Sequence, residues 1–386
     1  MGSAVCMTLL AAATVNDVAE LPIEELIKAQ AFGLGFDLAG ITALGPVDSG
    51  AAFDEWLSRG YAGDMSYMPR NAEKRRDTRR PFPGATSAIV VALNYGGTAP
   101  TGAIARYARG DDYHDVMWQK LNALHDWIEE ESGRNIPGKA YVDTGPILER
   151  DLARKAGLGW FGKNTNLLNP RLGSFFFIGS LLVELDLVAD EPFDTDRCGI
   201  CTRCLEACPT QALVAPGVLD STRCISYLTI EAKSEIPLEF RESLGGLIYG
   251  CDICQDVCPY NQKFSRPATE MALGPRTEME SPSLHELMGM STQSWLNFST
   301  KSPVRRAKRR GFLRNVAVAL GNSADPEAVP ALCEALSDEE ALVRGHAVWA
   351  LGQIGGPEAS TALLAHKSVE SDEWVLREIE AALHRA

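Results

Sequence analysis

The first half of the chain carries two kinds of hydrophobic pattern, one with helical spacing and one made of short continuous runs. Apolar residues at positions 23, 26, 27 and 31 fall on one face of a helix. The run Ala88–Leu93 is apolar and rich in β-branched residues, which is typical of a strand buried on both faces. By these criteria we expect helices at Ile23–Phe32, Phe53–Arg59 and Tyr113–Glu131, and strands at Asp37–Ala43, Ala88–Leu93, Lys139–Asp143 and Ser174–Leu187. This order predicts an α/β or α+β domain.

Glycines gather in Ala156–Lys163, between two of the predicted strands. No G-x-G-x-x-G motif follows a strand and opens a helix, which is the arrangement that binds dinucleotides. A nicotinamide or flavin site is therefore not indicated.

The C-terminal pattern is helical and repeats itself. Val316–Asn322 aligns with Ala347–Gln353, and Pro326-Glu-Ala aligns with Pro357-Glu-Ala, in both cases 31 positions later. Each unit contains two short helices broken by Gly and Pro, which predicts a HEAT-type α-solenoid.

Between these regions lie two runs of cysteines, each ending in Cys-x3-Cys-Pro. The first run follows the bacterial ferredoxin pattern C-x2-C-x2-C-x3-C-P, in which the fourth cysteine ligates the other cluster of a pair. The second run lacks one cysteine, because Ile248 stands where its first member belongs, and Cys224 is the only other cysteine between the runs. We predict one 4Fe-4S cluster on Cys198, Cys201, Cys204 and Cys258, and another on Cys208, Cys224, Cys251 and Cys254. Zinc and disulfides are the alternatives, and both fit the two Cys-x3-Cys-Pro endings poorly.

These patterns divide a chain of 386 residues, too long for one ordinary core, into several parts. We expect an extension at 1–19, the α+β domain at 20–193, a ferredoxin-like two-cluster domain at 194–264, a linker with packing helices at 265–300, and a basic helix with HEAT-like repeats at 301–386. The cluster domain is expected to be small and loop-rich, because metal centres replace a hydrophobic core.

Composition bears on the compartment. No window has the length of apolar sequence that spans a membrane, and the mildly apolar start lacks the basic leader of an export signal. Met7 is an alternative start. Cluster thiolates without a signal peptide predict a cytoplasmic protein with no membrane partner.

One short stretch departs from the acidic character of the chain, whose formal net charge is −14. Lys301–Arg314 holds seven basic residues and no acidic one. A solvated helix start is one interpretation, and contact with the phosphates of a nucleic acid is the other. The candidate contacts are Arg305, Arg306, Lys308, Arg309, Arg310 and Arg314.

Several motifs together resemble those of the epoxyqueuosine reductase family. They are Tyr107–His114, Val142–Arg150, Gly159–Asn164, Cys224–Glu231, the two cysteine runs and Gly311–Asn322. The resemblance implies an enzyme with cobalamin and two 4Fe-4S clusters, which reduces epoxyqueuosine in tRNA to queuosine. It also implies an N-terminal α+β cobalamin-binding domain and C-terminal repeats that help to hold the tRNA. Many members have His at the position of Asn164, so a role for an imidazole there is not carried over.

The resemblance assigns Asp143 as the proton donor, a role that requires a dry pocket to keep the carboxyl protonated. From the residues alone, an Asp beside Thr-Gly-Pro is more typical of a turn. The cobalamin contacts that we expect are Tyr107, Asp143, Arg154, Lys163, Asn164, Ser226, Tyr227 and Asp252. The clusters would supply electrons one at a time to a low-potential cobalt centre.

The histidines and the two remaining cysteines show no metal-binding pattern. The six histidines have no metal-binding spacing, no D-x-H-x-x-G motif is present, and Cys6 and Cys333 read as ordinary thiols. We expect a monomer that takes electrons from an unidentified donor. A reductive dehalogenase and a non-catalytic iron–sulfur protein that binds RNA are the alternative functions.

Overall fold

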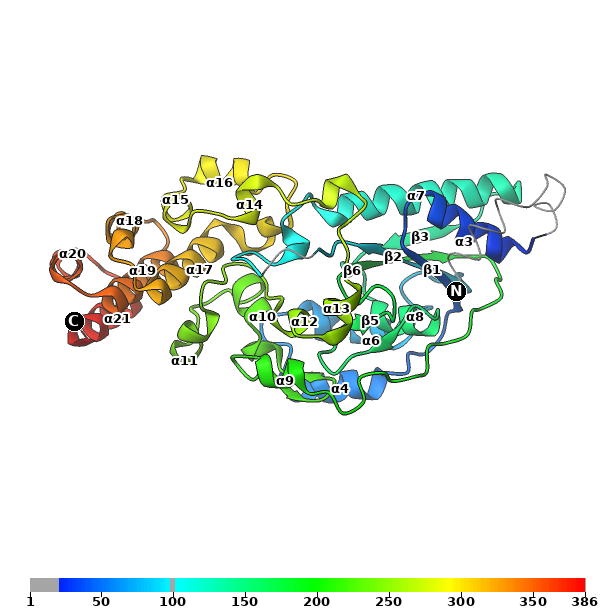
Figure 1. Ribbon diagram of the computed structural model, residues 1–386, viewed down its shortest axis with the longest axis horizontal. Helices are drawn as coiled ribbons and strands as arrows, with labels where there is room; N and C mark the ends of the chain where they lie inside the picture. Colours follow the sequence, from blue (N-terminus) through cyan, green and yellow to red (C-terminus); the bar gives the residue numbers. More distant parts are fainter. Residues whose placement is uncertain (1–20, 98–100, 386) are drawn as a thin grey trace.

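The computed structural model describes residues 21–97 and 101–385, and the predicted extension at 1–19, with Cys6 and Met7, lies outside these ranges. The chain forms an elongated molecule in which the sheet lies at one end and the helical repeats lie at the other, with the cysteine-rich segment between and below them (Figure 1). None of the helices in the described ranges has the length and hydropathy of a membrane span.

The N-terminal part is built on a four-stranded antiparallel sheet of order β1-β2-β6-β3. Its strands are β1 (Leu38–Ala43), β2 (Ser87–Asn94), β3 (Gly138–Tyr141) and β6 (Phe176–Val183). Because every pairing in the sheet is antiparallel and helices lie on its faces, this part is α+β rather than doubly wound α/β.

Strand β2 is buried along its whole length, as its apolar run predicts. Ile89, Val91 and Leu93 belong to a core with α3 (Ile23–Gly33) and α7 (Tyr113–Ser132) on one face of the sheet. Ala88, Val90 and Ala92 belong to a second core with α8 (Glu149–Lys155) on the other face. Alternate side chains of a strand point to opposite faces, so one apolar run serves two cores.

The other N-terminal elements complete the domain. The helix α4 (Gly50–Ser58) lies where the 53–59 pattern predicted one, whereas α8, α5 (Tyr67–Arg70) and α6 (Ala72–Arg76) were not predicted. Strand β3 ends at Tyr141 and strand β6 is shorter than the predicted Ser174–Leu187. Asp143 and Ser174, which were predicted to lie in strands, therefore lie in loops.

The cysteine-rich segment is made of short elements. They are α9 (Arg203–Ala207), β7 (Leu213–Ala215), β8 (Val218–Leu219), α10 (Ile225–Ile230), α12 (Ile253–Asp256) and α13 (Pro259–Phe264). Ile225 and Leu228 of α10 pack into the same core as the repeat helices, so the segment shares its hydrophobic contacts with its neighbour.

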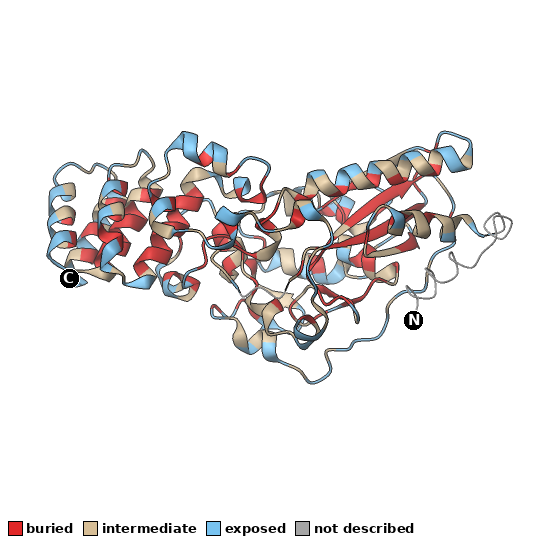
Figure 2. Cartoon of the chain, turned by 45° about the horizontal axis from the view of Figure 1, so that its top comes forward, coloured by how far each residue is buried: buried red, intermediate tan, exposed pale blue. Residues whose placement is uncertain are grey.

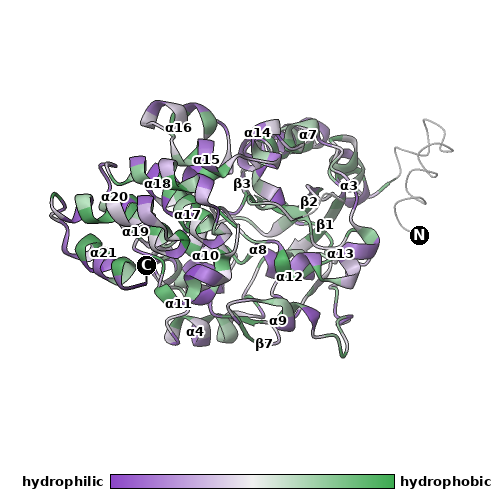
Figure 3. Ribbon diagram, turned by 60° about the vertical axis from the view of Figure 1, so that its left-hand side comes forward, coloured by the Kyte–Doolittle hydropathy of each residue, from purple (hydrophilic) through white to green (hydrophobic). Residues whose placement is uncertain are grey.

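The repeat region stacks α17 (Lys308–Ser323), α19 (Ala341–Ile354) and α21 (Glu373–Arg385) side by side, with α18 (Val329–Ala335) and α20 (Pro357–Lys367) beside them (Figure 3). The facing sides of these helices are buried (Figure 2). A Cβ at Gly321 would lie 2.7 Å from Trp349, and one at Gly352 would lie 2.6 Å from Ala382. Glycine at these repeat positions therefore allows the helices to approach closely.

Residues 265–300 form short helices that pack on the repeats. They are α14 (Thr277–Glu280), α15 (Leu284–Met288) and α16 (Thr292–Phe298). The rings of Trp295 and Phe298 lie 5.0 and 5.6 Å from that of Phe312 in α17. This aromatic cluster fixes α16 on the first repeat helix.

Candidate active site between the sheet and the cysteine runs

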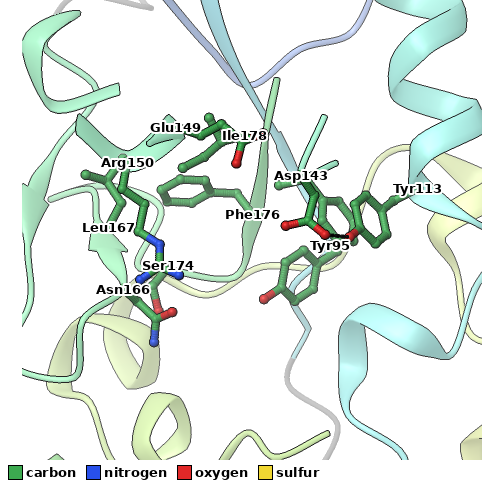
Figure 4. A pocket seen from close by; sticks show the side chains of 11 residues that line it. Tyr95, Tyr113, Asp143, Glu149, Arg150, Asn166, Leu167, Ser174, Phe176 and Ile178 are labelled. Carbon is green, nitrogen blue, oxygen red and sulfur yellow. Dashed lines mark hydrogen bonds between the residues drawn. The ribbon is translucent and has the colours of Figure 1, made fainter. Parts of the chain in front are cut away.

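A cavity of about 410 Å³ lies between the N-terminal sheet and the cysteine-rich segment. Aromatic side chains form much of the sheet side, namely Tyr95, Tyr107, Tyr113, Phe176 and Phe177. The opposite side includes four cysteines, Cys208, Cys224, Cys251 and Cys254. A second cavity of about 190 Å³ shares Tyr113, Asp143 and Arg150 with it and also contacts Glu149 (Figure 4). The larger volume lies in the range of small-molecule and cofactor sites.

Asp143 enters this space from the loop that follows β3. Its φ of 55° places it in the left-handed region, where Asp is tolerated better than most residues. The Tyr113 hydroxyl donates a hydrogen bond to its Oδ2 at 3.0 Å, and His114 Nε2 lies 3.8 Å from the same oxygen. The side chain is 66% exposed, so the dry surroundings that we expected for Asp143 are not present around its carboxyl.

Glu149, at the start of α8, is more enclosed than Asp143, with intermediate exposure of the residue as a whole. Burial raises the pKa of its carboxyl to about 8, and the nearby Asp143 adds to the rise. Its Oε1 is buried without a hydrogen-bond partner. A carboxyl with this pKa is protonated at neutral pH.

Two arginines shape the walls around these acids. Arg75 donates to the carbonyl oxygens of Gly145 and Ile147 at 3.1 and 3.0 Å, which holds the loop after Asp143. Arg150 donates to the carbonyl oxygen of Thr165 and extends toward Asn166 and Ser174 (Figure 4). We did not single out Glu149 and Arg150, although both lie in the Val142–Arg150 motif. Their surroundings depend on α6 and β5 (Leu167–Leu168), which are distant in sequence.

The hairpin of β4 (Trp160–Phe161) and β5 brings Asn164 to the cavity. A Cβ at Gly159 would lie 2.1 Å from the carbonyl oxygen of Leu168, so only glycine allows this approach. The Asn164 amide donates to the carbonyl oxygen of Cys254 at 3.2 Å. The glycine-rich stretch thus serves chain packing and the placement of an amide.

The cysteines of the two runs, together with Cys224, fall into two neighbourhoods. Burial raises the pKa of Cys204 and of Cys258, and the nearby thiol of Cys198 adds to both shifts. Burial also raises the pKa of Cys251 to about 12, with contributions from Cys224 and Cys208. Cys208, Cys224, Cys251 and Cys254 also border the large cavity together. The assignment of Cys198, Cys201, Cys204 and Cys258 to one cluster and of these four to the other stays a prediction.

Donors surround the sulfur atoms. Trp160 Nε1 donates to Cys198 Sγ at 3.5 Å, and the backbone N–H of Ala212 donates to Cys208 Sγ at 3.3 Å. Such hydrogen bonds stabilise thiolate ligands and tune the potential of a cluster. Within 21–97 and 101–385, no three His, Cys, Asp or Glu side chains are arranged to hold a single metal ion.

Of the residues that we expected around cobalamin, five line the cavity: Tyr107, Asp143, Asn164, Ser226 and Asp252. Asp252 is buried and its Oδ2 accepts from the backbone N–H and the guanidinium of Arg106, at 2.8 and 3.1 Å. Its carboxylate is thus already paired within the protein.

The other three lie outside both cavities, and each has a structural partner. Arg154 pairs with Asp48 and, at 2.9 Å, with Asp194. Lys163 Nζ donates to the carbonyl oxygens of Gly199 and Cys201, which supports the loop of the first cysteine run. The Tyr227 hydroxyl accepts from the backbone N–H of Asp64 at 2.7 Å. Their role as cobalamin contacts therefore stays a prediction.

The basic stretch is divided by the packing of α17. Arg305 and Lys308 are exposed. Arg306 pairs with Glu231 at 2.5 Å, and Arg309 pairs with Asp338 at 2.6 Å with its side chain 18% exposed. Arg310 lies 3.8 Å from Glu340.

Arg314 is 1% exposed, and its guanidinium donates to the carbonyl oxygens of Ala232, Ser234 and Leu228. The prediction that it contacts tRNA is wrong, because it lies on the inner side of α17 and fastens that helix to α10. Burial lowers its pKa to about 10.

Models of known families match three parts of the chain. Residues 75–144 match the family described as epoxyqueuosine reductase QueG, DUF1730. Residues 197–261 match the 4Fe-4S double cluster binding domain, and residues 306–384 match the HEAT repeats. The predictions of a two-cluster domain and of HEAT-like repeats are confirmed.

Curated relatives agree over most of the chain. The epoxyqueuosine reductase of Pseudomonas aeruginosa is 41% identical over 336 residues, which cover 83% of this chain and 92% of that protein. That of Escherichia coli is 38% identical over 373 residues, covering 94% and 97%. A crystal structure of epoxyqueuosine reductase with a tRNA-Tyr epoxyqueuosine-modified stem loop has a TM-score of 0.88 and 33% identity, covering 94% of this chain and 98% of that one. The chain belongs to the epoxyqueuosine reductase family.

Proposed function

We propose that this chain reduces the epoxide of epoxyqueuosine in tRNA to queuosine, the last step of queuosine biosynthesis. The observation that carries the proposal is the cavity, which has four cluster-type cysteines on one side and Asp143 on the other. An electron path and a proton source thus meet in one enclosed space. The relatives named as epoxyqueuosine reductases support the same reaction.

We infer that two 4Fe-4S clusters bind to the two cysteine sets and that cobalamin occupies the cavity. The fit rests on the aromatic wall of Tyr95 and Tyr107 and on polar groups of Asn164 and Ser226 at the edges, which suit a broad macrocycle with amide substituents. When bound, cobalamin supplies a low-potential cobalt centre that transfers electrons to a substrate carbon. The second cysteine set borders the cavity and so lies nearest to that centre.

Asp143 is the residue that we assign to donate a proton to the departing oxygen. The Tyr113 hydroxyl holds its carboxyl in the cavity. Burial and the Asp143 carboxylate raise the pKa of Tyr113, so that its hydroxyl stays protonated and serves as a donor. A solved epoxyqueuosine reductase from Bacillus subtilis, 32% identical with a TM-score of 0.86, is described with an aspartate catalytic loop swung out of its active site. The Asp143 carboxyl lies in the cavity here, with the hydroxyl of Tyr113 bound to it.

We assign tRNA binding to the exposed cations Arg305 and Lys308 and to the repeats behind them. Arg306, which lies above the ring of Tyr67 at 5.7 Å, is also exposed and adds to this surface. Neutralisation of phosphates by these side chains offsets the repulsion expected from a chain of net charge −14.

The test is an anaerobic assay on an epoxyqueuosine-containing tRNA stem loop, with the full chain reconstituted with iron, sulfide and cobalamin and supplied with a chemical reductant. Mass spectrometry of the nucleosides should show the loss of one oxygen, and samples without reductant should show none. If no corrinoid binds and the stem loop binds without reaction, the protein is instead a structural iron–sulfur protein that binds RNA.

A further inference from the structure

Glu149 is a second acid of the cavity, and it differs from Asp143 in its surroundings. Both carboxyls border the cavity of about 190 Å³ (Figure 4). Asp143 is largely exposed, whereas Glu149 carries a buried, unpartnered Oε1. A buried ionised carboxylate without a partner is costly, so this site favours the neutral acid.

The groups that face Glu149 come from three other segments and its own helix. They are Asp143 in the loop after β3, Tyr113 of α7, Arg75 of α6 and Arg150 of α8. Arg75 is turned toward the carbonyl oxygens of Gly145 and Ile147, and Arg150 toward Thr165. Because both arginines are engaged with carbonyl oxygens, burial outweighs their attraction and the Glu149 pKa stays near 8.

The reaction itself requires two protons. Removal of an epoxide oxygen breaks two C–O bonds and forms a C=C bond, and the oxygen leaves as water. The balance is one epoxide, two electrons and two protons giving one alkene and one water. A single carboxyl delivers one proton, so a second must reach the cavity before the cycle is complete.

We propose that Glu149 is the proton reservoir of this site, which stores the second proton and returns it to Asp143. The inference rests on the proposed function. Glu149 and Asp143 line the same cavity of about 190 Å³, so a proton has a short path between them. Proton transfer from Glu149 leaves a carboxylate that takes a proton back from solvent after the product has left. Glu149 affects the reaction only through Asp143, because it passes its proton to that residue and not to the substrate.

The first test does not depend on turnover. Infrared difference spectra of the full chain are recorded between pH 6 and pH 9.5. A carboxylic C=O band should disappear with a midpoint near pH 8, remain in Asp143→Asn and be absent from Glu149→Gln. If no such band exists in the wild type, or if it titrates in the ordinary carboxyl range, the reservoir is refuted, even where the Gln variant fails to fold.

The second test uses the reconstituted enzyme. Glu149→Gln keeps the shape of the side chain but holds no transferable proton, so kcat at pH 7 should fall roughly 10- to 100-fold with little change in KM. The fall in wild-type rate through pH 8 should be absent from this variant. Glu149→Asp should restore part of the rate, and Glu131→Gln at the exposed end of α7 should leave it unchanged.

The outcomes separate the two proposals. A wild type that does not act on the modified stem loop contradicts the proposed function. A wild type that acts, with a Glu149→Gln variant of unchanged kcat and pH profile, contradicts the reservoir alone.

Discussion

The backbone conformation of Asp143 limits which substitutions test its role. Its positive φ is accepted by Asp and Asn and by few other residues, so Ala would alter the loop as well as the carboxyl. The Tyr113 hydroxyl is able to donate to the amide oxygen of an Asn as it does to the carboxylate. Asn is therefore the substitution that changes proton transfer and little else.

Asp143→Asn should lower turnover by roughly two orders of magnitude or more, because an amide delivers no carboxylic proton. Cobalamin and tRNA binding should be retained, as measured by absorbance of the bound corrinoid and by gel shift. Asp126→Asn, on the exposed side of α7, is the control and should behave as wild type. A near-normal rate for the Asp143→Asn variant would remove Asp143 from the acid role.

At the scale of elements, Cys224 is the residue that we propose completes the second cysteine set. It lies at the start of α10, outside both runs, and borders the same cavity as Cys208, Cys251 and Cys254. Burial raises the pKa of its thiol, so the proton that it holds must be released when iron binds.

Cys224→Ala should lower the iron content of the reconstituted chain from about eight atoms to about four, since one of two cubanes loses a ligand. Iron is measured colorimetrically per chain and supported by the cluster absorbance. Cys333→Ala, in α18 of the repeats, is the matched control and should keep all the iron. Retention of about eight atoms in the Cys224 variant would contradict the swapped ligand arrangement.

The contact between α17 and α10 depends on one buried guanidinium. Arg314→Met should destabilise the full chain by on the order of 3 kcal/mol, because three carbonyl oxygens lose their donor inside the protein. Arg310→Met, one turn earlier on α17 and 41% exposed in its side chain, should cost less than about 0.5 kcal/mol. Chemical denaturation of the two variants checks the difference, and equal midpoints would show that Arg314 contributes nothing to the docking of the helix.

At the scale of the whole molecule, charge is distributed unevenly. The chain is acidic overall, yet it presents Arg305 and Lys308 next to the first repeat helix. The polyanionic substrate is expected to dock by phosphate contacts there, while a single base enters the cavity.

Neutralising Arg305 and Lys308 to Gln should weaken binding of full-length tRNA and reduce the slope of log affinity against log salt by about two units. Reduction of a short stem loop should suffer less, because it offers fewer phosphates. The control is a double variant of Arg134, which follows α7, and Lys139 of β3, both of which are exposed cations of the sheet domain. Unchanged affinity and slope in the test variant would mean that tRNA binds elsewhere.

Much of the architecture follows from local sequence pattern. The spacing of Cys198–Cys208 and Cys251–Cys258 implies clusters because ligand geometry limits how far thiolates lie apart along the chain. The repeats are evident from a period of 31 residues, since each unit buries its apolar face against the next. Strand β2 was predicted correctly because a short, continuous apolar run is typical of a strand that is buried on both faces.

Tertiary structure alone decided the environment of each polar side chain. Arg305 and Arg314 stand in the same basic stretch, yet one is exposed and the other is buried against three carbonyl oxygens. Asp143 and Glu149 are six residues apart, yet Glu149 is the more enclosed of the two. The sequence by itself therefore determined the cofactor pattern and the repeats, which depend on spacing. Which charges are paired, and which acid holds its proton, depends on desolvation by segments distant in the chain.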